Sequence, residues 1–263
     1  MFRGDKKEGF SNTIDPTSLV LPNHFSALVT QCNNFRISEF QRLSTFNYKQ
    51  LQDIIKASFD KIEKDSMSKD ATTIIRTCYI VDCLRELCPE RLLELINITS
   101  KFCPTRNIDC EILKSYVTSK LYNKFDGSEN LKNKLSSMYN SFTDQESSIY
   151  FLFYLVQYSP KTVLLNIPKQ LFISIILKAF SSENKKIQEI SVETLRKYID
   201  IIKTLPELSM DNNIHPFGQL LFFSVLLEKG QFQLFSNYKN NFIMFSSCSD
   251  AQDQYIKWQA IYC

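Results

Sequence analysis

The chain has 263 residues, of which 44% are apolar and 22% are charged, and its formal net charge is +3. This composition suits a folded chain with a sizeable core and excludes an intrinsically disordered one. Only 5 residues are glycine, about 2% against roughly 7% in average usage. Because tight hairpins and phosphate-binding loops need glycine at positive φ, the sequence predicts an all-α protein.

The same sequence argues against a membrane protein and against a secreted one. The longest apolar runs, Ile149–Val156 and Leu220–Leu227, reach about half of the length that a membrane-spanning helix needs. The N-terminal residues carry mixed charge and lead into no apolar stretch of the kind found in secretory signals. The 8 cysteines form no CxxC pair and are too sparse for a disulfide scaffold. We therefore expect an intracellular chain with no membrane span and with reduced, mostly buried thiols.

Apolar residues at helical spacing recur along most of the chain, after a polar segment at residues 1–18 that we expect to be a flexible leader. The predicted helices, in chain order, are 22–33, 36–45, 47–64, 70–88, 89–103, 109–125, 129–142, 145–158, 168–181, 184–204, 217–229, 231–245 and 250–262. Several predicted starts have an N-cap residue or a proline that suits the first turn, namely Asp70, Asp109, Asp144, Asn184, Pro89 and Pro168.

The predicted helices show a period when they are taken in pairs. The first members begin near residues 47, 89, 128 and 168, in steps of about 40 residues. A recurring helix pair of this length is typical of HEAT or armadillo solenoids, in which each unit buries its apolar side against its neighbours. We expect a right-handed α-α superhelix over residues 19–263, with units near 47–88, 89–127, 128–167, 168–205 and 206–263. The alternative is a compact helical bundle with evenly spaced loops.

One predicted pair, at about residues 168–201, resembles a HEAT repeat in its sequence. The second helix of that family typically opens with Asp, then has an aliphatic residue followed by Arg, a small residue and a Leu. The corresponding positions hold Asn184, Ile187, Gln188, Ser191 and Leu195. The chain thus has Asn and Gln where the family has Asp and Arg. The resemblance implies an adaptor that holds other proteins through an extended surface.

Residues suited to catalysis or metal binding do not form a recognisable pattern. His24 and His215 are far apart in the sequence, with no carboxylate or cysteine near them at metal spacing. Cys78, Cys83 and Cys88 recur at a spacing that spreads them around a helix, so we expect them in the core. No phosphate-binding, nucleophile-elbow or zinc-protease motif occurs. We expect no catalytic, cofactor-binding or metal site, no small-molecule substrate and therefore no enzyme.

The predicted helix 184–204 has two distinct sides. One side is an apolar stripe formed by Ile187, Ile190, Leu195, Ile199 and Ile202. The other side holds Lys186, Glu189, Glu193, Lys197, Asp200 and Lys203. This polar side is either simply solvated or a binding surface. In HEAT-like proteins the second helices line the groove where partners bind, so the resemblance makes these six residues the candidate protein-binding face. Glu193 and Lys197 also have the spacing of an i,i+4 ion pair.

These observations favour a non-catalytic scaffold, adaptor or regulatory subunit that binds other proteins in a larger intracellular complex, in the cytoplasm or the nucleus. Two groups of aromatic residues could stack on nucleic-acid bases, namely Tyr150–Tyr154 and the phenylalanines Phe217, Phe222, Phe223, Phe232, Phe235, Phe242 and Phe245. From Phe217 to Phe245 the only basic residues are Lys229 and Lys239, so we expect these rings in the core. A net charge of +3 gives no electrostatic footprint for a duplex. Direct contact with nucleic acid is therefore disfavoured. The alternative is a nucleic-acid-associated helical repeat protein in a nuclear complex, and a compact helical enzyme with a site of acidic residues ranks third.

Overall fold

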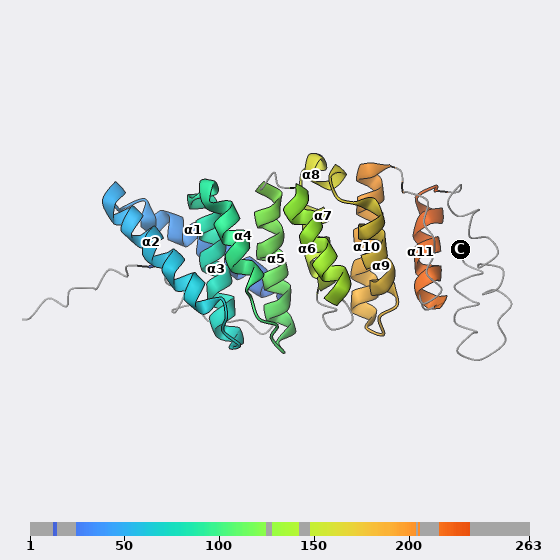
Figure 1. Cartoon of the computed structure of the whole chain (residues 1–263), viewed down its shortest axis with the longest axis horizontal. Coiled ribbons are helices and arrows are strands. Elements are labelled where there is room, and N and C mark those ends of the chain that lie inside the picture. Colours follow the sequence, from blue (N-terminus) through green and yellow to red (C-terminus); the bar gives the residue numbers. More distant parts are fainter. Residues whose placement is uncertain are drawn as a thin grey trace, which may run out of the picture. The chain divides into compact units, whose positions relative to one another are not determined.

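Figure 1 shows a computed structural model of the chain, which describes residues 13–14, 25–124, 128–141, 148–203, 205 and 216–231. The described residues form helices and their connecting segments, with no strand among them. The protein is therefore all-α in this part of the chain, as the sequence predicts. The chain divides into two compact units, a first unit over Met1–Lys124 and a second unit over Phe125–Cys263.

The first unit contains α1 (Phe25–Leu43), α2 (Tyr48–Asp65), α3 (Ala71–Leu87), the short 3-10 helix η1 (Pro89–Arg91), α4 (Leu92–Ser100) and α5 (Ile108–Lys124). The second unit contains α6 (Ser128–Ser141), α7 (Ile149–Tyr158), α8 (Lys161–Leu165), α9 (Lys169–Phe180), α10 (Lys185–Ile202) and α11 (Pro216–Glu228). Most of these helices lie within a few residues of their predicted positions. The predicted helices 231–245 and 250–262 lie outside the described residues.

The prediction was wrong for α1, which is one continuous helix where the sequence predicted two, 22–33 and 36–45. Asn33 and Asn34 lie near the expected break, but asparagine is only a weak helix former and neither glycine nor proline interrupts the helix. The side chain of Asn33 also accepts a hydrogen bond from the hydroxyl of Tyr116 in α5, at 3.0 Å. Tertiary contact therefore outweighs the weak local preference at this turn.

The sequence also missed α8, which has only five residues. This helix starts directly after Pro160, whose fixed φ is already compatible with a helical turn. Leu164 is its buried residue. A helix this short shows no full apolar period, so the pattern that predicted the longer helices could not reveal it.

Side chains at the helix starts explain why several helices begin where they do. The Asp70 carboxylate accepts the backbone N–H of Thr73 at 2.8 Å, and the Asn184 amide oxygen accepts that of Lys186 at 3.0 Å. Both caps confirm the prediction. At α5 the cap is Asn107, which accepts the N–H of Cys110 at 3.0 Å, and not the predicted Asp109. An N-cap side chain satisfies a backbone donor that the helix itself leaves without a partner.

The first described residues lie within the segment 1–18 for which the sequence predicted a flexible leader. Ile14 is buried, and its backbone N–H donates to the hydroxyl of Ser58 in α2 at 3.0 Å. At this residue the chain is held against the first unit. The remainder of the predicted leader lies outside the described residues, apart from Thr13.

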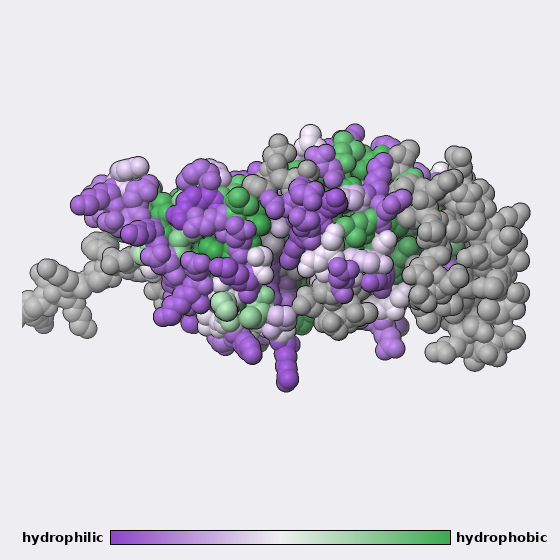
Figure 2. All heavy atoms as spheres, in the orientation of Figure 1, coloured by the Kyte–Doolittle hydropathy of each residue, from purple (hydrophilic) through white to green (hydrophobic). Residues whose placement is uncertain are grey.

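The core of the first unit is built around α3. This helix packs against α1, α2, α4 and α5, and every residue from Thr77 to Arg85 is buried. In the view of Figure 2 the surface of the first unit is mostly hydrophilic, with apolar side chains showing at α4, where Leu93 is exposed. Because the stretch from Thr77 to Arg85 is buried, any polar residue within it must find its partners inside the protein.

The core of the second unit centres on α9, which packs against α6, α7, α10 and α11. Phe172, Ile176 and Phe180 are among its fully buried residues. The ring of Phe172 stacks on that of Tyr198 in α10, with 3.8 Å between the ring centroids. Among the described residues of this unit, no Asp, Glu, Lys or Arg is buried.

Candidate protein-binding face

The structure places the two sides of α10 largely as the sequence predicts. Four members of the expected apolar stripe are buried, while Ile190 is half-buried. On the polar side, Lys197 is half-buried and the other five residues are exposed, namely Lys186, Glu189, Glu193, Asp200 and Lys203. We call the six predicted residues the α10 face. Five of them lie on α10 and Lys203 directly follows it as the C-cap, so the structure keeps the six residues together.

A glutamine that the sequence analysis did not single out joins the middle of the α10 face to α7. The Lys197 ammonium donates to the backbone oxygen of Gln157 at 3.3 Å and to its side-chain oxygen. The side-chain amide of Gln157 donates to Glu193 at 3.3 Å. Among the described residues no ion pair links Glu193 directly to Lys197, so the predicted i,i+4 pair is replaced by a bridge through Gln157. The bridge fixes two side chains of the face against the neighbouring helix.

The C-terminal end of the α10 face is held by residues at and beyond the end of α11. Asp200 pairs with Lys229 at 2.8 Å, and the side chain of Gln231 donates to the backbone oxygen of Lys203 at 3.0 Å. Lys203 itself ends the helix in the left-handed conformation, with φ of 65°. Such a residue turns the chain sharply and closes the last helical turn, a role that glycine fills more often.

The charges of the α10 face balance one another. Its six residues comprise three lysines and three carboxylates, so the formal charge of the face is zero. A nearby pair of Arg196 and Glu228 adds one charge of each sign. A surface with both signs interspersed selects its partner by the pattern of charges, whereas a polyanion would need a consistent excess of positive charge.

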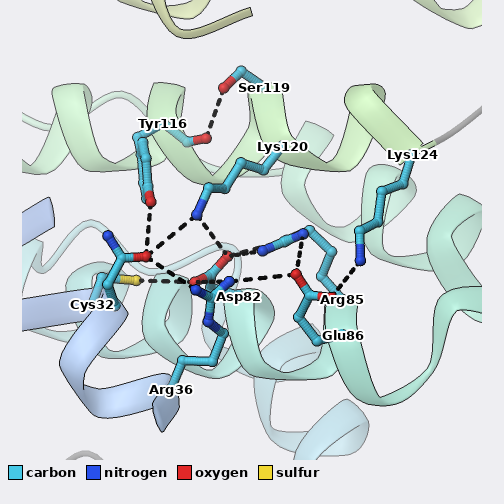
Figure 3. Close-up of polar contacts among 10 residues, drawn as sticks. Cys32, Arg36, Asp82, Arg85, Glu86, Tyr116, Ser119, Lys120 and Lys124 are labelled. Atoms are coloured by element: carbon cyan, nitrogen blue, oxygen red, sulfur yellow. Dashed lines mark hydrogen bonds and ion pairs between the residues drawn. The ribbon is translucent and has the colours of Figure 1, made fainter. Parts of the chain in front are cut away.

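A second polar cluster, which the sequence analysis did not find, lies in the first unit (Figure 3). Asp82 of α3 is fully buried, and Arg85, one turn further along, donates to it at 3.1 and 2.9 Å. Arg85 also pairs with Glu86 at 2.7 Å. From α5, Lys120 approaches Asp82 at 3.8 Å and Lys124 pairs with Glu86. These five residues form what we call the Asp82 cluster.

Helix α1 covers the Asp82 cluster and adds contacts of its own. Arg36 lies 3.6 Å from the Asp82 carboxylate and 3.4 Å from that of Glu86. The thiol of Cys32 lies 3.8 Å from Asp82. The hydroxyl of Tyr116 in α5 donates to Asn33, as described above. Figure 3 shows these side chains converging from three helices.

Burial and neighbouring charges shift the pKa values of Cys32, beside the Asp82 cluster, and of Lys120 and Glu86 within it. Burial raises the pKa of the Cys32 thiol, and the Asp82 carboxylate raises it further, so this thiol stays protonated. Burial lowers the pKa of Lys120, although the attraction of Asp82 opposes that shift. Partial burial would raise the pKa of Glu86, but the hydrogen bond from Lys124 and the charges of Arg85, Lys124 and Arg36 outweigh it, so the pKa lies below the usual range. The residues of the Asp82 cluster thus pair with one another and link α3 to α5.

The remaining predictions concern cysteines, histidines and aromatic residues. Five of the six described cysteines are buried, as expected, and all six have free thiols. Nowhere in the described part of the chain do three or more His, Cys, Asp or Glu side chains gather in a way that could hold a metal ion. His24 and His215 lie outside the described residues. In the aromatic stretch Tyr150–Tyr154, all but Phe153 are buried, which confirms their expected place in the core.

Comparisons with family models, with curated proteins and with solved structures found no match. Within the described ranges, no helix combines the length and the apolar character that crossing a membrane would require.

Proposed function

We propose that the chain is a non-catalytic scaffold, adaptor or regulatory subunit that binds other proteins in an intracellular complex. The observation that carries the proposal is the α10 face, a row of exposed charges that Gln157 and Lys229 hold in defined positions. Side chains that are already positioned lose less conformational entropy when a partner binds. A balanced pattern of charge also fits a protein partner of mixed charge better than a nucleic acid.

We also propose that the helix pairs stack as a HEAT-like, right-handed α-α superhelix, with a compact bundle as the alternative. Within the second unit, α9 contacts both α6 and α11, and α7 contacts α10. Contacts between first helices and between second helices of consecutive pairs are what stacked repeats require. Small-angle scattering tests this proposal, because a compact domain of 263 residues has a radius of gyration of about 18 Å. We expect about 21 to 23 Å for five stacked pairs with the usual helix spacing, and a value near 18 Å would favour the bundle.

The binding face is tested by exchanging charges without changing the net charge. In the full chain, Lys186→Glu combined with Glu189→Lys inverts two exposed positions of the α10 face. The matched control, Lys49→Glu combined with Asp53→Lys, inverts two exposed positions on α2. Each tagged chain is recovered from cells and its co-purifying proteins are quantified by mass spectrometry.

We expect the α10 exchange to reduce recovery of specific protein partners by about tenfold or more, because like charges then face one another across the interface. The α2 exchange should leave recovery unchanged. Equal recovery with all three chains would contradict a binding role for the α10 face. Salt-sensitive binding of all three chains to an oligonucleotide would instead favour the nucleic-acid-associated alternative.

A further inference from the structure

Helix α1 lies on the side of the first unit that α3 and α5 form together. Its buried residues Leu28, Cys32 and Phe35 follow the i, i+4, i+7 spacing of one helix face. The ring of Phe35 stacks on Tyr79 of α3, with 5.8 Å between the ring centroids. On the opposite side of α1, Ile37 is 55% exposed. The helix is thus an amphipathic element laid on a surface that α3 and α5 build.

The contact between α1 and this surface is rich in polar interactions. The Tyr79 hydroxyl lies 3.2 Å from the side-chain oxygen of Gln31, and the Tyr116 hydroxyl donates to Asn33. Arg36 faces Asp82 and Glu86. An apolar centre surrounded by hydrogen bonds and ion pairs is the composition of interfaces between separate proteins. A permanent core of the same area is expected to be more apolar, as the core of the second unit is.

The surface of α3 and α5 keeps its own charge partners without α1. Asp82 and Glu86 are both paired with Arg85 of the same helix. Lys120 and Lys124 from α5 add a further cation to each carboxylate. Release of α1 would therefore expose charges that are still paired with one another. It would not leave a buried charge without a partner, which is the change that destabilises a protein most when a buried ion pair is broken.

We propose that the surface of α3 and α5 is a docking site for an amphipathic helix of a partner protein, and that α1 is its occupant within the free chain. The partner helix would present large apolar residues at the spacing of Leu28, Cys32 and Phe35. It would carry a basic residue directly after the last of them, in the place of Arg36, to meet the carboxylates of Asp82 and Glu86. In this mode of recognition, an amphipathic helix lays its apolar face on the surface of its partner. The site shares no residue with the α10 face.

The occupied state lowers the affinity of the site for any incoming helix. A partner binds only the fraction of molecules in which α1 has left, so the apparent dissociation constant is the intrinsic one divided by that fraction. Substitutions that weaken the α1 contact raise the open fraction and should strengthen binding by the same factor. This inverse relation distinguishes a displaceable occupant from a structural helix.

Hydrogen exchange of the full wild-type chain, followed by mass spectrometry, measures the open fraction directly. We expect the backbone amides of α1 to exchange at least tenfold faster than those of α3, because α1 opens more often than the rest of the unit. Exchange of α1 and α3 at one common rate of opening would show that α1 leaves only when the unit unfolds, and would overturn the proposal.

A labelled synthetic peptide of residues 25–43 serves as the probe for the site itself. Its affinity is measured for the full wild-type chain, for Phe35→Ala, for the milder Arg36→Gln and for the control Ile37→Ala on the exposed side of α1. Truncation of a buried phenylalanine weakens the α1 contact enough to raise the affinity on the order of 100-fold. Arg36→Gln should raise it by about tenfold, and Ile37→Ala should match wild type.

A peptide that itself carries Phe35→Ala should lose this affinity, which ties binding to the helix face in question. Equal affinity for the wild-type, Phe35→Ala and Arg36→Gln chains would overturn the proposal, as would a failure of the peptide to bind any of them. Arg36→Gln keeps the test valid if Phe35→Ala does not fold. None of these results depends on the α10 face, so the two proposals succeed or fail separately.

Discussion

The two units place the charges of their packed helices in opposite ways. In the first unit, Asp82 and Arg85 lie inside, beneath α1. In the second unit, α10 turns its charges outward and buries an apolar stripe together with Tyr198. The difference shows that a charge can be buried where several helices supply its partners, as α1, α3 and α5 do. In the second unit the packed side of α10 is mainly apolar and aromatic, whereas in the first unit α1 lies against paired charges of α3 and α5.

The strongest test of this difference introduces a buried carboxylate into the second unit. Leu195 is fully buried on α10, and Leu195→Asp places there the same group that Asp82 carries in the first unit. Without a basic side chain to pair with it, as Arg85 pairs with Asp82, the new carboxylate should lower the free energy of unfolding by more than about 4 kcal/mol. Urea unfolding measures the loss. Lys186→Asp, at an exposed position in the first turn of α10, is the control and should change stability by less than about 0.5 kcal/mol. A wild-type unfolding curve for Leu195→Asp would show that the stripe is not packed.

The converse test removes one buried charge from the first unit. Asp82→Ala leaves the guanidinium of Arg85, which is only 4% exposed, with one carboxylate fewer. Breaking a buried pair from one side costs about 3 to 5 kcal/mol. The matched change in the second unit is Asp200→Ala, which breaks an exposed pair with Lys229 and should cost less than about 1 kcal/mol. Equal losses in urea unfolding would mean that burial does not distinguish the two pairs.

The sequence predicts most helices and the orientation of α10, because both follow from local spacing of apolar residues. It could not predict the Asp82 cluster, since two of the partners of Asp82, Arg36 and Lys120, lie at distant positions that only the fold brings together. A hint was present: Asp82 interrupts the apolar run of α3 with Arg85 three residues later, the spacing of a helical ion pair. Gln157 was missed for the same reason as Arg36, because it acts across two helices. The contact of Asn33 in the middle of α1 with Tyr116 is likewise long-range and could not be predicted from local spacing.

Two buried tyrosines give a comparison in which the expected changes have opposite signs. The hydroxyl of Tyr79 in the first unit has Gln31 as its partner, whereas that of Tyr198 in the second has no hydrogen-bond partner among the described residues. Tyr79→Phe should therefore destabilise the chain by about 1 kcal/mol. Tyr198→Phe removes an unsatisfied buried group, keeps the ring stacked on Phe172, and should stabilise the chain by up to about 1 kcal/mol. Thermal unfolding shows whether each variant is more or less stable than wild type. A loss of stability in Tyr198→Phe would show that the hydroxyl of Tyr198 has a hydrogen-bond partner.

The smallest expected effect is the pH dependence contributed by Glu86. Its pKa is lower in the folded chain than in the unfolded one, despite the opposing effect of partial burial, because Lys124, Arg85 and Arg36 favour the carboxylate. A group with a lowered folded pKa stabilises the fold above its unfolded pKa, about 4.3 for glutamate, and loses that contribution as the pH falls through the folded value. Wild type should therefore exceed Glu86→Gln in stability by about 1 kcal/mol or less at pH 7, since the group is partly exposed. Urea unfolding between pH 7 and pH 3 should show this difference shrinking below about pH 4.3. A difference that stays constant across this range would mean that the charge of Glu86 does not help to hold the Asp82 cluster together.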